Sequence, residues 1–85
     1  MIEELVEKYI GNTQQAFKQA NRRSPHSEET ERVLDHAKRY LEDAVYYSGR
    51  KRFETALASV AYCEGLLDAL RLLGMVEFQW PTETV

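Results

Sequence analysis

The first part of the chain, residues 2–22, carries its apolar and small side chains at helical spacing. They recur every three or four positions, at Ile2, Leu5, Val6, Tyr9, Ile10, Thr13, Ala16, Phe17 and Ala20. Charged and amide side chains, together with Gly11, fill the opposite side. Because a period of 3.6 residues places such positions on one face, we predict an amphipathic helix over residues 2–22 that packs on one side only.

A second segment, predicted as a helix over residues 26–48, has the same one-sided pattern. Its apolar and small positions are Val33, Leu34, Ala37, Tyr40, Leu41, Ala44, Val45 and Ser48. Pro25 suits a first helical position and disfavours helix before it, so Ser24 or Ser27 is the predicted N-cap. Gly49 follows the last periodic residue, which predicts a glycine in the left-handed conformation just after the helix.

The third segment, residues 51–73, is apolar or small around about half of its circumference. The positions are Ala56, Ser59, Val60, Tyr62, Cys63, Leu66, Leu67, Ala69, Leu70 and Leu73. A helix with so wide an apolar arc needs two neighbours, so this segment is predicted to be the centre of the fold. Gly74 is predicted to end it.

After the third helix, the tail of residues 75–85 alternates apolar and polar side chains. Val76, Phe78 and Trp80 are separated by Glu77 and Gln79. This period of two predicts an extended strap with one side buried. The whole pattern therefore predicts one all-α domain over residues 1–85, an up-and-down three-helix bundle with a short extended C-terminal strap.

Length and composition limit this picture further. A chain of 85 residues with 44% hydrophobic content supports one modest core, so association with a protein partner or a homodimer is expected. The net charge of −3 is mixed along the chain and gives no general attraction to nucleic acid. The acidic N-terminus lacks a signal-peptide pattern, and no apolar run has the roughly 18 residues of a membrane span. Together with the single cysteine, Cys63, these features predict a cytoplasmic protein.

The region 34–80 also resembles a known family. The matching blocks include Asp43-Ala44-Val45-Tyr46-Tyr47, Tyr62-Cys63-Glu64-Gly65-Leu66-Leu67-Asp68-Ala69-Leu70-Arg71 and Leu73-Gly74, of which the stretch from Tyr62 to Gly74 is the most specific. They resemble an uncharacterised archaeal family, domain of unknown function 357, whereas the residues before Leu34 show no resemblance. The resemblance implies a short three-helix bundle of unassigned function, found alone or attached to nucleotidyltransferase-like domains. It implies no catalytic residue.

Glu64, Asp68 and Arg71 are four and three positions apart, so they share one edge of the third helix. Two carboxylates and a guanidinium group are able to hold a small molecule or a cation, although a metal site needs more ligands than this edge offers. The simpler interpretation is a solvated ion-pair cluster worth roughly a few tenths of a kcal/mol per pair. As the most polar patch on an apolar helix, this edge is the first candidate site.

Arg39, Asp43 and Tyr46 share the side of the second helix that lies away from its apolar stripe. An exposed aromatic side chain is typical of protein interfaces, but a tyrosine also lies along a surface with only its hydroxyl in water. Both interpretations remain open.

Other chemistry is not expected. His26 and His36 have no second histidine or cysteine at metal-ligand spacing, so we expect no metal and no cofactor. Cys63 lies on the buried arc and is expected to be a core residue. The basic runs 21–23 and 50–52 fall at opposite ends of the predicted bundle, which argues against nucleic-acid binding.

The sequence therefore favours a non-catalytic protein-interaction or assembly module. It would bind through the edge of Glu64, Asp68 and Arg71, through Tyr46, or through the strap with Phe78 and Trp80. The alternative is an accessory domain that binds a small molecule or cation at the same edge, linked to a nucleotidyltransferase-type enzyme. A third alternative is weak nucleic-acid binding at residues 50–52.

Overall fold

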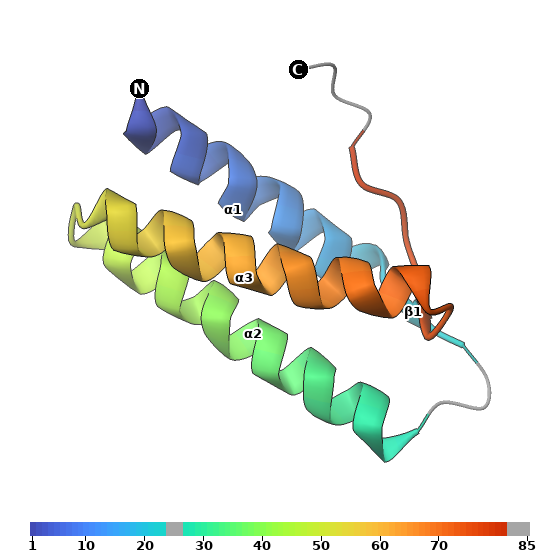
Figure 1. Cartoon of the computed structure of the whole chain (residues 1–85). Coiled ribbons are helices and arrows are strands. Elements are labelled where there is room, and N and C mark those ends of the chain that lie inside the picture. The colour runs from blue at the N-terminus through green and yellow to red at the C-terminus, as the bar shows by residue number, and fades with distance from the viewer. Residues whose placement is uncertain (24–26, 82–85) are drawn as a thin grey trace.

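The computed structural model describes residues 1–23 and 27–81. Three helices, α1 (Ile2–Gln19), α2 (Glu28–Gly49) and α3 (Phe53–Leu72), follow one another up and down, with α3 packed against both α1 and α2 (Figure 1). Two short strands, β1 (Asn21–Arg22) and β2 (Val76–Glu77), pair at one end. The predicted all-α bundle with a C-terminal strap is confirmed.

The core lies where the three helices meet. Its fully buried residues come from every helix and include Val6, Thr13, Ala37, Ala44, Ala56, Val60, Cys63 and Leu67. Small side chains on the facing sides of α2 and α3 let the two helix axes approach closely. As predicted, α3 is the central helix, because it alone packs extensively against both of the others.

The first helix ends earlier than predicted, at Gln19 instead of residue 22. Ala20 is already extended, and Asn21 and Arg22 pair antiparallel with Glu77 and Val76 of β2. The apolar stripe stops at Ala20, so continuing the helix would bury nothing more. Backbone hydrogen bonds to the strap replace the helical ones instead.

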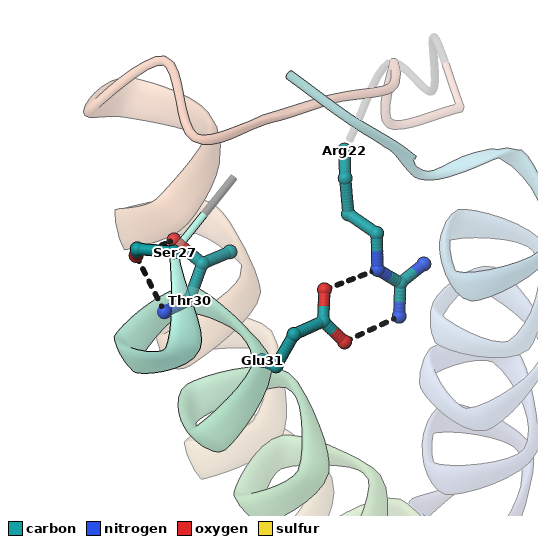
Figure 2. Close-up of polar contacts among 4 residues, drawn as sticks. All are labelled: Arg22, Ser27, Thr30 and Glu31. Carbon is teal, nitrogen blue, oxygen red and sulfur yellow. Dashed lines mark hydrogen bonds and ion pairs between the residues drawn. The ribbon is translucent and has the colours of Figure 1, made fainter. Parts of the chain in front are cut away.

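The second helix begins at a serine cap. Ser27 accepts a hydrogen bond from the Thr30 backbone N–H at 3.1 Å, so it is the N-cap; the alternative, Ser24, and the neighbouring Pro25 lie outside the described residues (Figure 2). Beside this cap, the Arg22 guanidinium donates two hydrogen bonds to the Glu31 carboxylate. This ion pair ties β1 to the first turn of α2.

The two glycines expected to end helices behave differently. Gly74 has a φ of 78°, and the Met75 and Gly74 N–H groups donate to the carbonyls of Leu70 and Arg71, which is the hydrogen-bond pattern of a glycine cap. The prediction for Gly49 is wrong. It is the last residue of α2, and the left-handed residue of the turn is Lys51, with a φ of 62°.

The backbone hydrogen bonds of the α2–α3 turn explain why Lys51, and not Gly49, takes the left-handed conformation. The Arg50 N–H still donates to the carbonyl oxygens of Tyr46 and Tyr47, so the helical bonding runs past the glycine. The third helix consequently starts at Phe53, two residues later than predicted.

Candidate functional site

The polar edge of α3 is built around the Asp68 carboxylate. One of its oxygens, Oδ1, accepts hydrogen bonds from the Arg71 Nε at 3.0 Å and from the Trp80 indole Nε1 at 2.8 Å. Trp80 of the strap therefore contacts α3 at Asp68, one helical turn before Arg71. These donors, Trp80 first, hold the pKa of Asp68 below its ordinary value.

Glu64 does not join Asp68 and Arg71 in one network. It lies on the side of α3 that faces α1, where its Oε2 is 3.4 Å from the Thr13 hydroxyl oxygen. That hydroxyl makes its shorter bond, 2.7 Å, to the Tyr9 carbonyl oxygen. Burial is the main reason that the pKa of Glu64 is raised, with the neighbouring Asp68 charge adding to it and the Thr13 contact opposing it.

The C-terminal strap packs on its own bundle. Val76 and Phe78 are buried, Glu77 and Gln79 are exposed, and the Phe78 and Trp80 rings meet edge to face at 4.9 Å. A shallow hollow of about 430 Å³ remains beside the Trp80 ring, lined by Ala61, Glu64, Gly65, Asp68 and Trp80. Phe78 is therefore a core residue, whereas Trp80 borders the surface.

Replacing Trp80 by phenylalanine is expected to keep the ring contact and remove the hydrogen bond to Asp68. We expect a loss of about 1 kcal/mol in the free energy of unfolding near neutral pH, and a rise in the pKa of Asp68. A carboxylate whose pKa is lowered by folding stabilises the fold at pH values above its pKa in the unfolded chain. That contribution is lost as the pH falls through its pKa in the folded protein. The difference between wild type and Trp80→Phe should therefore shrink from pH 6 to pH 2.

Chemical denaturation at several pH values, with an NMR titration of Asp68, measures both effects. Gln79→Ala is the control, because Gln79 is an exposed residue of the same strap. An unchanged pKa of Asp68 in Trp80→Phe would show that the indole does not stabilise its charge.

Arg39, Asp43 and Tyr46 lie elsewhere, on the exposed side of α2. The Tyr46 ring is edge to face with Tyr47 at 5.2 Å, and the Arg50 guanidinium carbon is 5.6 Å from its centroid. Tyr46 thus lies in the last turns of α2, with its ring beside Arg50 of the α2–α3 turn. His36 and Tyr40 of α2 pack against Tyr62 of α3. The exposed surface of α2 therefore lies on the Tyr62 side of α3, opposite the side that carries the Asp68 carboxylate.

The two basic runs are also apart. Arg22 and Arg23 are at the end of the bundle where β1 pairs with the strap, and residues 50–52 form the turn at the other end (Figure 1). Arg22 is paired with Glu31, while Arg50 and Arg52 lie over the rings of Tyr46 and Tyr47. These cations are placed for local contacts and do not form one basic patch.

The sequence pattern missed one surface, the side of α3 that points away from both other helices. We call it the outer face. After Glu54, every exposed residue of α3 is uncharged, and the outer face consists of Ala58, Ala61, Tyr62, Gly65, Ala69 and Leu72. Leu72 is 71% exposed, and Leu73, which follows the helix, is 69% exposed. An apolar surface of this length on a helix is unusual, because solvent-facing positions normally carry polar side chains.

The exposed sides of the other two helices are conventional by comparison. They carry mainly charged side chains, among them Glu3, Glu7, Lys18, Glu29, Arg32, Lys38, Arg39, Glu42 and Asp43. The outer face was not predicted from the sequence, because Tyr62, Ala69 and Leu73 belong to the wide apolar arc that was expected to pack against the other two helices. One feature of the sequence could have indicated the outer face: the apolar arc of the third helix is wider than two neighbouring helices can cover.

The described part of the chain consists of residues 1–23 and 27–81. No group of three or more histidine, cysteine or carboxylate side chains in these ranges is placed to hold a metal ion. None of the helices there combines the length and the apolar character that crossing a bilayer requires.

Comparison with known proteins places the chain in a family. No curated protein and no solved structure matches it. A family model described as "Protein of unknown function (DUF357)" matches residues 8–76. The match includes most of α1, where the sequence blocks indicated no resemblance, and residues 34–76 of the region 34–80, and it ends before Phe78 and Trp80. Because that match covers well over half of the chain, the protein belongs to the DUF357 family.

Proposed function

We propose that this chain is a cytoplasmic, non-catalytic interaction module that binds a protein helix through the outer face of α3. The observation that carries the proposal is the uncharged, exposed surface along four turns of the central helix, from Ala58 to Leu72. Small side chains at Ala61, Gly65 and Ala69 would let a second helix approach closely, and Leu72 supplies apolar area at one end.

Ligand binding at the polar edge has less support. The Asp68 carboxylate is already used by Arg71 and Trp80, and the hollow beside it is shallow. A small molecule or cation there would have to compete with the contact that fastens the strap. A cytoplasmic setting is consistent with Cys63, which is a buried free thiol.

Site-specific photo-crosslinking in cells of the native organism tests the proposal. A benzophenone amino acid is placed at Gly65, an exposed position where an added Cβ atom meets no atom within 4 Å. Gly11 is the matched control, because it is also an exposed helical glycine with open space, but it lies on the polar side of α1. We expect a protein adduct from position 65 and none from position 11.

A second variant tests whether the adduct depends on the apolar character of the face. Ala69→Glu, combined with the photo-crosslinking residue at position 65, places a charge on the outer face at an exposed position and should change stability by less than about 0.5 kcal/mol. We expect it to abolish the adduct while the circular dichroism spectrum stays helical. Equal crosslinking from positions 11 and 65, or no adduct from either, would overturn the proposal.

A further inference from the structure

We infer that the occupant of the outer face is a second copy of this chain, with the two α3 helices packed antiparallel about Gly65. This inference rests on the proposed function and names the partner of the same surface. It is carried by the order of side-chain sizes along the outer face, by the charges at the two ends of α3, and by the small size of the core.

The side chains of the outer face complement one another when a second α3 runs in the opposite direction. Residues equally far from Gly65 then meet, so Ala61 faces Ala69 of the second copy, and Ala58 faces its Leu72. Gly65 lies opposite itself on the two-fold axis. The small residues Ala61, Gly65 and Ala69 therefore lie along the middle of the pair, where the backbones come closest, and each large leucine meets a small alanine. Tyr62 lies at the α2 side of the outer face, beside His36 and Tyr40.

The ends of α3 carry charges of opposite sign in positions that an antiparallel pair would bring together. Glu54, an exposed acidic residue of α3, lies in its first turn. At the other end, the Arg23 backbone N–H donates to the Met75 carbonyl at 3.1 Å, so the backbone of the exposed Arg23 is held beside Met75, three residues after the end of α3. Antiparallel packing brings Glu54 of each copy close to Arg23 of the other, and the two helix dipoles also oppose each other favourably.

A parallel arrangement lacks both features. It would place Leu72 against Leu72 and the Glu54 carboxylates at the same end, which is unfavourable for size and charge. The antiparallel pair also extends the limited core of an 85-residue chain. Each 20-residue helix is about 30 Å long, and one pair of such helices buries less surface area than a standard protein interface. The dimer is therefore expected to be weak and to form at micromolar concentrations or above.

Disulfide trapping tests the register of the two helices. Under mild oxidation, Gly65→Cys should form a covalent dimer rapidly, because the two Cα atoms lie close to the axis. Ala58→Cys alone should not, since seven residues separate it from the axis, about 10 Å along each helix. A mixture of Ala58→Cys with Leu72→Cys should again crosslink. The native Cys63 is buried and should not interfere. Crosslinking of Ala58→Cys alone would overturn the antiparallel register.

Sedimentation equilibrium with charge reversals tests the ends of the interface. Wild type should pass from monomer to dimer between micromolar and millimolar concentration. Glu54→Arg or Arg23→Glu should each weaken the dimer about tenfold, and the double variant should restore it. Glu42→Arg on α2 is the control and should change nothing. A failure of the double variant to restore association would overturn the ion pair and with it the register.

Failure of the inference can be distinguished from failure of the proposed function. A wild type that stays monomeric at millimolar concentration, together with a Gly65 photo-adduct heavier or lighter than a dimer, overturns the second copy and leaves the outer face a docking surface for another protein. A photo-adduct with the mass of a dimer supports both. An absence of any adduct at position 65 overturns both.

Discussion

Replacing Leu67 by alanine is expected to lower the free energy of unfolding by about 2–5 kcal/mol. Leu67 is completely buried in the middle of α3 and belongs to the core shared by all three helices. Removing its isobutyl group loses the transfer free energy of the buried atoms and leaves a cavity that the surrounding helices fill only in part. In a domain of this size, that loss is a large fraction of the total stability.

The same substitution at Leu72 is the matched control. Leu72 is on the same helix but is 71% exposed, so Leu72→Ala should change the free energy of unfolding by less than about 0.5 kcal/mol. Both variants are measured by urea denaturation at low micromolar concentration, where self-association contributes least. Equal losses for the two variants would show that α3 is not buried as described.

The thiol of Cys63 is expected to react with a disulfide reagent about a thousandfold more slowly in the folded protein than in the unfolded chain. Burial raises the pKa of Cys63 to about 12, and the nearby Glu64 charge adds to this effect. Each unit of pKa above the ordinary value lowers the thiolate fraction tenfold at neutral pH. Complete burial of the side chain slows the reaction further, because the reagent must reach the sulfur atom.

The rate of reaction at neutral pH, in buffer and in guanidinium chloride, measures the effect. Leu67→Ala is a useful companion variant, because more frequent unfolding should accelerate the reaction of Cys63 in buffer. A rate in buffer equal to that in denaturant would show that the thiol is accessible.

Because the unfolded thiol ionises near pH 8.5 to 9 and the folded one does not, the free energy of unfolding should fall as the pH rises above about 9.

Much of the fold could be predicted from the sequence alone, because local periodicity determines which side of each helix is apolar. The stripe on residues 2–20 and the stripe around Leu34 and Leu41 each require one packing surface. The wider arc around Val60 and Leu67 requires two, which makes the third helix central. Gly74 and the alternation from Val76 to Trp80 are equally local signals, and the structure has the predicted cap and strap there.

The candidate site was less predictable, because its geometry depends on residues distant in the sequence. Spacing placed Glu64, Asp68 and Arg71 on one edge, but packing divides them: α1 approaches Glu64 through Thr13, while the strap brings Trp80 to Asp68. Whether the surfaces around Tyr46, Arg39 and Asp43 serve a partner stays a prediction.

The sequence by itself determined the helices, their order and the central position of α3, because each follows from the spacing of side chains along a local segment. Only the tertiary structure decided how far the first helix extends, that Lys51 and not Gly49 takes the left-handed turn, and which part of the wide arc of α3 remains uncovered. Two neighbouring helices cover only part of the circumference of a third. Where they pack, and therefore which apolar residues such as Leu72 are left in water, is set by contacts between segments and not by the pattern within one.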